Sequence, residues 1–274
     1  MSSRVLSKEE KFARLGRPKR IWAIAAVHGD VYRLHDLHRL IGRRFRPGER
    51  LVYLGNYVGP AGPPIETIDE LLAFRRALLA LPGMLVSDIV YLRGRQEEMW
   101  HKLLQIQFAT NPVQVLTWMQ QHGLESMLEA YGGDLRQGIS AARQGVMALT
   151  RWTKELRDNL RAHPGHDTFF TVLRRAAMTE NDAEGAVLLV HAGVEGSRSL
   201  TAQGDAFWWG GADFDRLPGP FENFRRVVRG YDPNNGGVRK TDYTMTIDDG
   251  CGFGGKLACA CLSGSGDLLE MIKT

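Results

Sequence analysis

Imidazole, amide, guanidinium and phenol side chains follow the apolar runs of this sequence at the points where those runs end. The side chains in these positions are His28, Asn56, Arg95, Gln96, His191 and Tyr231. Imidazole nitrogens and amide oxygens can bind metal ions, and a guanidinium fork suits a phosphate. Because ligands of α/β folds bind beyond the carboxyl ends of the strands, His28, Asn56 and the segment 94–96 are expected to share one site.

The first hundred residues alternate between buried-strand and amphipathic-helix patterns. Strands are predicted at residues 21–27, 51–54 and 89–92, and helices at residues 31–45 and 65–81. Each strand pattern is a continuous apolar run, which is typical of a strand covered on both faces. The β-α-β-α-β order predicts an α/β fold.

The rest of the chain adds helices first and strands later. Residues 100–175 are mostly helical in pattern, and residues 186–190 and 225–229 read as strands. Residues 243–247 and 256–262 are interpreted as an antiparallel pair joined by a glycine-rich turn. We therefore expect a basic arm over residues 1–20 and a single domain over residues 21–274, with a helical insertion at about 100–180.

Composition and charge exclude several classes of protein. The chain has 274 residues, 43% of them hydrophobic, and a formal net charge of +4. No apolar run reaches the roughly 20 residues of a membrane span, so no membrane association is expected. The basic arm contains one aromatic residue, Phe12, and no series of aromatic residues between its charges, which argues against nucleic acid as a partner. The cysteines, Cys251, Cys259 and Cys261, do not form a disulfide framework, and a cytoplasmic location is the expectation.

Five strand-end segments occur in a fixed order along the chain: AAVHGDVYRL, YLGNYVGPAG, YLRGRQEEM, VHAGV and VVRGYDP. This order resembles the calcineurin-like metallophosphoesterases of the phosphoprotein phosphatase type, which include bacterial serine/threonine protein phosphatases and diadenosine tetraphosphatases. The resemblance covers residues 21–262, nearly the whole chain. It implies a four-layer α/β/β/α sandwich with a helical insertion, and a two-metal centre that hydrolyses phosphate esters.

The motifs of this chain depart from the family pattern at most of the metal-binding positions. In the first motif the histidine is present as His28, but the aspartate is replaced by Ala26. In the second motif the bridging aspartate is replaced by Asn56, and the later Asp-Arg pair is Gly59-Pro60. The remaining departures are Arg95 for the ligating asparagine, Gln96 for the histidine that acts as general acid, and Tyr231 for the last histidine; His191 is retained.

These departures remove most of the chemistry that the resemblance implies. Asn56 cannot bridge two cations as a carboxylate does, and Gln96 cannot act as a proton donor. No cofactor is therefore expected. A single Mn, Fe or Zn ion held by His28, Asn56 and His191 is the alternative.

The leading hypothesis is a pseudophosphatase, a catalytically inactive protein that binds a phosphorylated ligand or a protein partner in the old cleft. Arg95 and Arg229 are the candidates for phosphate binding. For Arg95 the competing interpretation is that it fills the vacated cavity and pairs with Glu97 or Glu98. The alternative function is a residual phosphoesterase or serine/threonine protein phosphatase acting on a phosphoprotein or a nucleotide. The aromatic cluster 207–209 is interpreted as core packing, or as a surface that faces a partner.

Overall fold

The computed structural model describes residues 11–180, 185–211 and 213–274. Residues 1–10, which contain Arg4 and Lys8 of the expected basic arm, lie outside the described part. No helix in the described residues has the length and apolar character that crossing a membrane requires.

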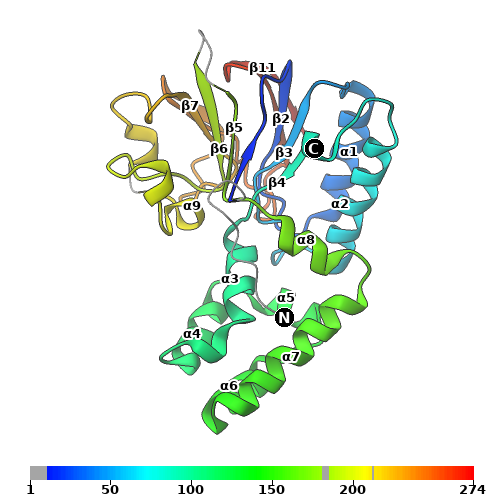
Figure 1. The fold of residues 1–274 in the computed structure, drawn as a ribbon, viewed down its shortest axis with the longest axis vertical. Helices are drawn as coiled ribbons and strands as arrows, with labels where there is room; N and C mark the ends of the chain where they lie inside the picture. Colours follow the sequence, from blue (N-terminus) through cyan, green and yellow to red (C-terminus); the bar gives the residue numbers. More distant parts are fainter. Residues whose placement is uncertain (1–10, 181–184, 212) are drawn as a thin grey trace.

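Two β-sheets form the centre of the molecule (Figure 1). One sheet has the strand order β1-β5-β6-β7-β9-β8, and the other has the order β11-β10-β2-β3-β4. The strands of the first sheet are β1 Phe12–Arg14, β5 Ala176–Met178, β6 Ala186–Val190, β7 Phe224–Arg229, β8 Arg239–Lys240 and β9 Thr244–Thr246. The strands of the second sheet are β2 Arg20–Ile24, β3 Arg50–Tyr53, β4 Ile89–Tyr91, β10 Ala258–Ser263 and β11 Leu268–Lys273.

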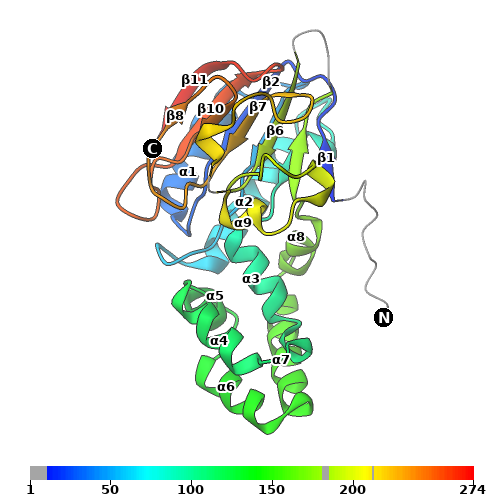
Figure 2. The same cartoon turned by 90° about the vertical axis from the view of Figure 1, so that its left-hand side faces the viewer.

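Helices cover the second sheet and continue away from it as an extension (Figure 2). The helices beside the sheet are α1 Val31–Arg44 and α2 Pro64–Leu79. The helices from α3 to α8 are α3 Arg95–Leu103, α4 Pro112–Gln121, α5 Glu125–Ala130, α6 Leu135–Gln144, α7 Val146–Ala162 and α8 His166–Val172. The short helix α9, Ala206–Trp209, lies beside the first sheet. The expected insertion at about 100–180 corresponds to this run from α3 to α8.

Three layers of apolar packing join these elements. One cluster lies between the two sheets and includes Ala23 and Val52 of one sheet and Leu189 and Val228 of the other. A second cluster packs α1, α2 and the helical extension against the outer face of the β2-β3-β4 sheet. A third packs α9 and its neighbouring loops on the outer face of the β6-β7 sheet. The order of layers is therefore α/β/β/α, as the resemblance implies, with the last helical layer reduced to short helices.

The expected arm over residues 1–20 is wrong for its last part. Phe12–Arg14 forms β1, which pairs in parallel with β5, and Leu15 is buried in the core between the sheets. The positive charges of this segment suggest that it is solvated, but backbone pairing with β5 incorporates it into the sheet.

The predicted antiparallel pair near the carboxyl end is also wrong. β9 pairs with β7 and β8 in one sheet, whereas β10 pairs with β2 and β11 in the other. Both edges of each strand are therefore occupied by other partners. The glycine-rich turn, with Gly250, Gly252 and Gly254 at positive φ, carries the chain from one sheet to the other.

Candidate functional site

The site begins at the carboxyl ends of β2 and β3, where two residues adopt left-handed backbone conformations. His28 has φ 54° and Asn56 has φ 53°. Non-glycine residues adopt this region infrequently, and such conformations gather at functional sites. The amides of Val27 and His28 both donate to the Asn56 carbonyl oxygen, at 3.0 and 2.7 Å. The turns after β2 and β3 therefore hold one another in place.

Two glycines allow the backbone to approach His28 closely. A Cβ atom at Gly59 would lie 2.9 Å from the Cα of His28, and one at Gly252 would lie 2.5 Å from its Cβ. Gly59 is one of the positions where the sequence departs from the family pattern, and in the structure it leaves room for the backbone of His28. The edge of the Phe253 ring packs against the imidazole, with ring centroids 4.9 Å apart.

His191 and Tyr231 come from the other sheet and complete the aromatic wall of the site. Their rings stack with centroids 5.2 Å apart, and Tyr231 also lies 5.5 Å from the His28 ring. Tyr231 and Ala26 pack with Ala192 in a small apolar cluster. The residues that replace a family aspartate and a family histidine thus fill this part of the site with apolar and aromatic atoms.

Both histidines are neutral at physiological pH. Burial, followed by the nearby Arg95 charge, lowers the pKa of His28 to about 3. Burial also lowers the pKa of His191 to about 3, against the opposing effect of a hydrogen bond to the Leu54 carbonyl. In that bond, Nδ1 of His191 donates to Leu54 over 2.6 Å. The neutral ring of His191 therefore carries its lone pair on Nε2.

Several buried polar atoms at this site have no hydrogen-bond partner within the described residues. They are both ring nitrogens of His28, Nε2 of His191, Nδ2 of Asn56 and Nε of Arg95. Buried polar groups are hydrogen-bonded in the great majority of native structures, so a group of orphaned atoms in one place needs an explanation. A ligand that binds among them would supply the missing partners.

Arg95, the first residue of α3, contributes the positive charge of the site. Its guanidinium carbon lies 5.4 Å from the centroid of Trp209 and 5.2 Å from that of Tyr231. Within the described part of the chain, no carboxylate lies within ion-pair distance of it. Two basic residues near it in the sequence do have such a partner, because Arg93 and Lys102 both form ion pairs with Glu98.

Arg95 does not form the ion pair with Glu97 or Glu98 that the competing interpretation includes. The carboxylate of Glu97 accepts hydrogen bonds from the amides of Asn56, Tyr57 and Gly94, at 2.8 to 2.9 Å. Burial raises the pKa of Glu97 to about 7 although these amides favour the charged form. Glu97 therefore fixes the loop after β3 to the start of α3, and Glu98 is occupied by Arg93 and Lys102.

Gln96 occupies the position of the expected general acid, and both its side-chain amide nitrogen and its backbone amide donate hydrogen bonds. Its side-chain amide donates to the carbonyl oxygen of His122 over 3.1 Å. Its backbone amide donates to Oδ1 of Asn56 over 3.1 Å. The side-chain oxygen of Asn56 therefore already accepts a hydrogen bond. The orphaned Nδ2 of Asn56 is a hydrogen-bond donor, which suits an anion.

Arg229 does not share the properties of Arg95. It is buried, with Nη2 3.1 Å from both Asp215 and Asp232, and Nε donates to Thr246 over 2.9 Å. Asp215 and Asp232 also pair with Arg239. The structure therefore places Arg229 in an internal network, which argues against its candidacy as a phosphate ligand.

The residues at this site do not fit the two-metal centre that the resemblance implies. In residues 11–180, 185–211 and 213–274, no group of three or more His, Cys, Asp and Glu side chains is placed to hold a metal ion. His28, His191 and Asn56 lie in one neighbourhood, but they include no carboxylate. Hard divalent cations prefer oxygen ligands with negative charge, so this donor set lacks what a binuclear centre needs.

The structure adds an aromatic group that the sequence analysis did not assign to the site. Trp118 and Trp209 contact edge to face, with centroids 5.0 Å apart, and His122 stacks on Trp118. Phe207 and Trp208 are buried, as core packing predicts, whereas Trp209 is half-buried and borders Arg95. Trp118 lies on the helical extension, so sequence order alone gives no signal that it reaches the site.

Comparisons with known proteins agree with this architecture. No protein-family model matches the sequence, and no curated protein sequence matches it. A solved structure assigned as a diadenosine tetraphosphatase has a TM-score of 0.53 and 17% identity, covering 96% of this chain and 97% of that chain. A protein serine/threonine phosphatase from Saccharomyces cerevisiae has a TM-score of 0.50 and 16% identity, covering 96% and 82% of the two chains. A mutant cold-active protein tyrosine phosphatase has a TM-score of 0.51 and 13% identity, covering 98% and 85%.

These similarities extend over nearly the whole chain at low sequence identity. The chain therefore shares its fold with these phosphatase structures. Because fold alone does not establish chemistry, the function must be argued from the site.

Proposed function

We propose that this protein is a pseudophosphatase, which has lost the hydrolytic metal centre and binds a phosphorylated ligand or partner in the old cleft. The observation that supports this most directly is Arg95, which lies at the strand ends without a carboxylate partner among the described residues. Around it, the family's acidic positions hold the uncharged side chains of Ala26 and Asn56.

The donors at the site suit a phosphate group. The guanidinium of Arg95 has an orphaned Nε, and Asn56 has an orphaned Nδ2. A guanidinium fork binds phosphate oxygens through charge-assisted hydrogen bonds, which are about twice as strong as neutral ones. His28 is neutral, and its protonated ring nitrogen adds another donor without adding charge.

The same residues give no route to hydrolysis by the two-metal mechanism. That mechanism lowers the pKa of a bridging water and needs cations that the donor set does not accommodate. Gln96, at the position of the general acid, cannot transfer a proton to a leaving group, because a carboxamide does not ionise at an accessible pH. Removal of the carboxylates together with the cations also avoids leaving buried negative charges unpaired.

Residual phosphoesterase activity is the second candidate, and the orphaned nitrogens of His28 and His191 favour it. Neutral imidazoles with free lone pairs remain competent to bind one soft or borderline cation. The two candidates differ in whether added metal produces turnover.

Phosphate binding without metal tests the proposal. We expect isothermal titration calorimetry in the presence of a chelator to detect binding of phosphoserine or inorganic phosphate. The Arg95→Gln variant should weaken this binding at least about tenfold, because it removes a hydrogen-bonded charge. Arg151→Gln, which changes an exposed arginine on α7, is the matched control and should bind as the unmodified protein does.

A turnover screen separates the two candidates. Phosphomonoesters, phosphodiesters and dinucleotides are incubated with the protein and Mn²⁺, and phosphate release is measured. The pseudophosphatase proposal predicts no release above that of a His28→Ala/His191→Ala variant. Metal-dependent release that this variant abolishes would establish the residual phosphoesterase instead.

A further inference from the structure

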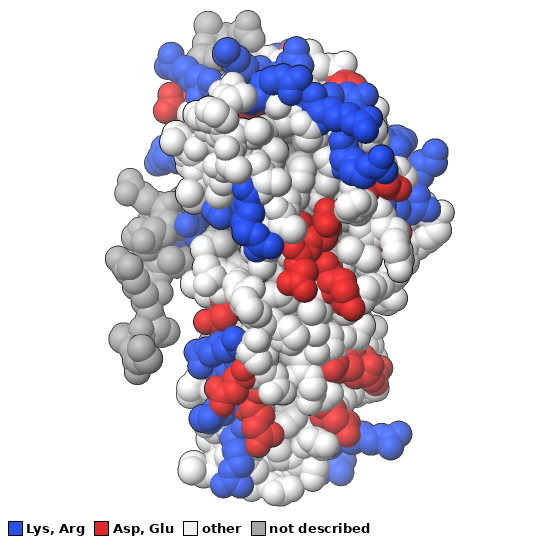
Figure 3. All heavy atoms as spheres, turned by 90° about the vertical axis from the view of Figure 1, so that its right-hand side faces the viewer, with Lys and Arg blue, Asp and Glu red and all other residues white. Residues whose placement is uncertain are grey.

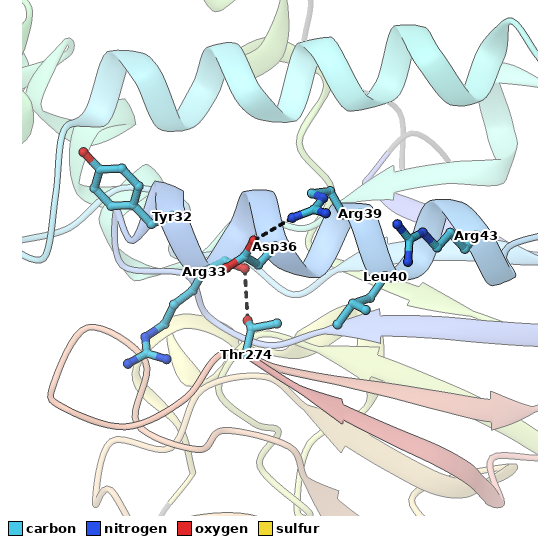
Figure 4. A pocket seen from close by; sticks show the side chains of 7 residues that line it. All are labelled: Tyr32, Arg33, Asp36, Arg39, Leu40, Arg43 and Thr274. Atoms are coloured by element: carbon cyan, nitrogen blue, oxygen red, sulfur yellow. Dashed lines mark hydrogen bonds and ion pairs between the residues drawn. The ribbon is translucent and has the colours of Figure 1, made fainter.

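A charged hollow lies along helix α1, which covers the outer face of the sheet that contains β2. Its volume is about 370 Å³, and its lining includes Tyr32, Arg33, Asp36, Arg39 and Arg43 of α1 (Figure 4). Thr274 borders it from the segment after β11 and donates from its hydroxyl to the Arg33 carbonyl over 3.0 Å. None of the residues that surround Arg95 takes part in this hollow.

The hollow carries an excess of positive charge. Three arginines line it against one aspartate. Arg33 pairs with Asp30 at 3.0 Å. Arg39 is 3.6 Å from Asp36, and the side chains of Arg39 and Asp36 are both about three fifths exposed. Arg43 has no ion pair with any carboxylate of the described residues. At least one guanidinium is therefore free, and a second is held by an exposed pair that contributes little.

The stability of the helix explains only part of the arrangement of these arginines. Arg39 and Arg43 are both exposed and stand four residues apart, so they are neighbours on one helical face. Like charges at this spacing destabilise an isolated helix by a few tenths of a kcal/mol. Arg43 gains from its position in the last turn of α1, but Arg39 lies outside that turn. An acidic ligand would offset the repulsion between the two.

The wider surface has the same sign of charge. Figure 3 shows the face on which α1 and α2 lie, and Lys and Arg side chains gather at its upper end, away from the helical extension. Glu and Asp side chains form a separate group nearer the middle of this face. A concentrated positive field of this kind steers acidic partners toward the surface that carries it.

The hollow is long and includes apolar as well as charged side chains. The residues from Tyr32 to Arg43 span about 16 Å of helix axis, at a rise of 1.5 Å per residue. Tyr32 is 82% exposed at one end, and Leu40 lines the hollow between the arginines. A compact anion such as phosphate would contact only part of this length, whereas an extended peptide could reach all of it.

We propose that this hollow, the α1 groove, is a docking site for an acidic peptide segment of a partner protein. Carboxylates of the peptide pair with Arg39 and Arg43, and an apolar or aromatic residue contacts Tyr32 and Leu40. The site goes beyond the phosphate-binding cleft, so it can exist whether or not Arg95 binds a phosphorylated ligand.

Peptide binding by the full chain tests the proposal. Fluorescence anisotropy is measured at low salt with a set of labelled octapeptides, each carrying four Asp or Glu residues and one Leu or Tyr at a varied position. A matched set has Asn and Gln in place of the acids. We expect at least one acidic peptide to bind, its neutral match to fail, and the affinity to fall as salt screens the charges.

Variants of Arg39 and Arg43 test whether peptide affinity depends on these two arginines. Arg39→Gln/Arg43→Gln should weaken the bound peptide about fivefold, since exposed ion pairs contribute modestly and glutamine keeps the helix propensity of α1. Arg76→Gln/Arg151→Gln removes two exposed helical arginines elsewhere and serves as the matched control. Thermal unfolding followed by circular dichroism checks that both variants fold.

Three results would overturn the proposal. The first is that no acidic peptide of the set binds. The second is an equal loss of affinity in both double variants, which would mean that net charge alone attracts the peptide. The third is that inorganic phosphate binds in a manner that depends on Arg39 and Arg43 while the peptides do not, which would make the groove a site for small anions.

Discussion

Two arginines at the strand ends of this molecule have opposite environments. Arg229 is buried among Asp215, Asp232 and Thr246, and each part of its guanidinium group has a partner. Arg95 lies between the rings of Trp209 and Tyr231, and its Nε has no hydrogen-bond partner in the described residues. A satisfied arginine holds the structure together, whereas an unsatisfied one is available to a ligand.

The same contrast separates the polar atoms around the two arginines. Near Arg229, Asp232 accepts hydrogen bonds from the amides of Asn234 and Gly236 as well as from Arg239. Near Arg95, the free atoms belong to His28, His191 and Asn56. We therefore expect the region around Arg229 to contribute to stability and the region around Arg95 to bind a ligand.

The largest effect is expected from Arg229→Met. This change leaves Arg239 as the only arginine paired with Asp215 and Asp232, and removal of one member of a buried ion pair costs about 3 kcal/mol or more. Urea unfolding measures the loss in the free energy of unfolding. Arg225→Met, at an arginine that is 42% exposed, is the control and should change the free energy by no more than about 0.5 kcal/mol. A similar small change for both variants would contradict the structural role of Arg229.

A pH-dependent effect is expected from His191→Gln. The folded pKa of His191 is about 3, below the value of about 6.5 for an unfolded chain. Between these values the unfolded state binds more protons, so the contribution of His191 to stability is lost as the pH falls. Over that range the slope is about 1.4 kcal/mol per pH unit for one such group.

Unfolding of the protein and of His191→Gln is therefore compared from pH 7 to pH 4 by denaturant titration. Glutamine does not titrate, so the stability of the variant should fall less steeply as the solution becomes more acidic. Parallel curves would mean that His191 is not buried in its neutral form.

The smallest effect on stability is expected from Arg95→Gln. No ion pair with a described carboxylate is lost, and a half-buried charge is removed, so the free energy of unfolding should change by less than about 1 kcal/mol. The same variant should lose phosphate binding. A loss of stability as large as that of Arg229→Met would show that Arg95 is structural, and the division between the two regions would fail.

The sequence predicts the parts of the fold that depend on continuous local patterns. The apolar run 186–190 matches β6, and the helical periodicity after Asp30 matches α1. Asp30 caps the first turn of α1, because its side chain accepts a hydrogen bond from the backbone amide of Arg33. The location of the site also follows from the sequence, because parallel strands bring their carboxyl ends together.

The errors involve partners that are distant along the chain. A strand pattern does not say which sheet a strand joins, so β9 and β10 were expected to pair with each other. The three-residue strand β1 has no recognisable strand pattern, because charged residues surround it in the sequence. It forms through its pairing with β5. The difference between Arg95 and Arg229 depends on Asp215 and on Glu97, whose contacts are set by the fold rather than by proximity in the sequence.

The metal content of the purified protein tests the central claim most directly. The chain is incubated with excess Mn²⁺ and desalted, and the bound metal per chain is measured by plasma mass spectrometry. Loss of the carboxylates at the positions of Ala26 and Asn56 predicts a value near zero. A value near one or two would mean that the site still assembles a metal centre, and the proposal of a pseudophosphatase would be contradicted.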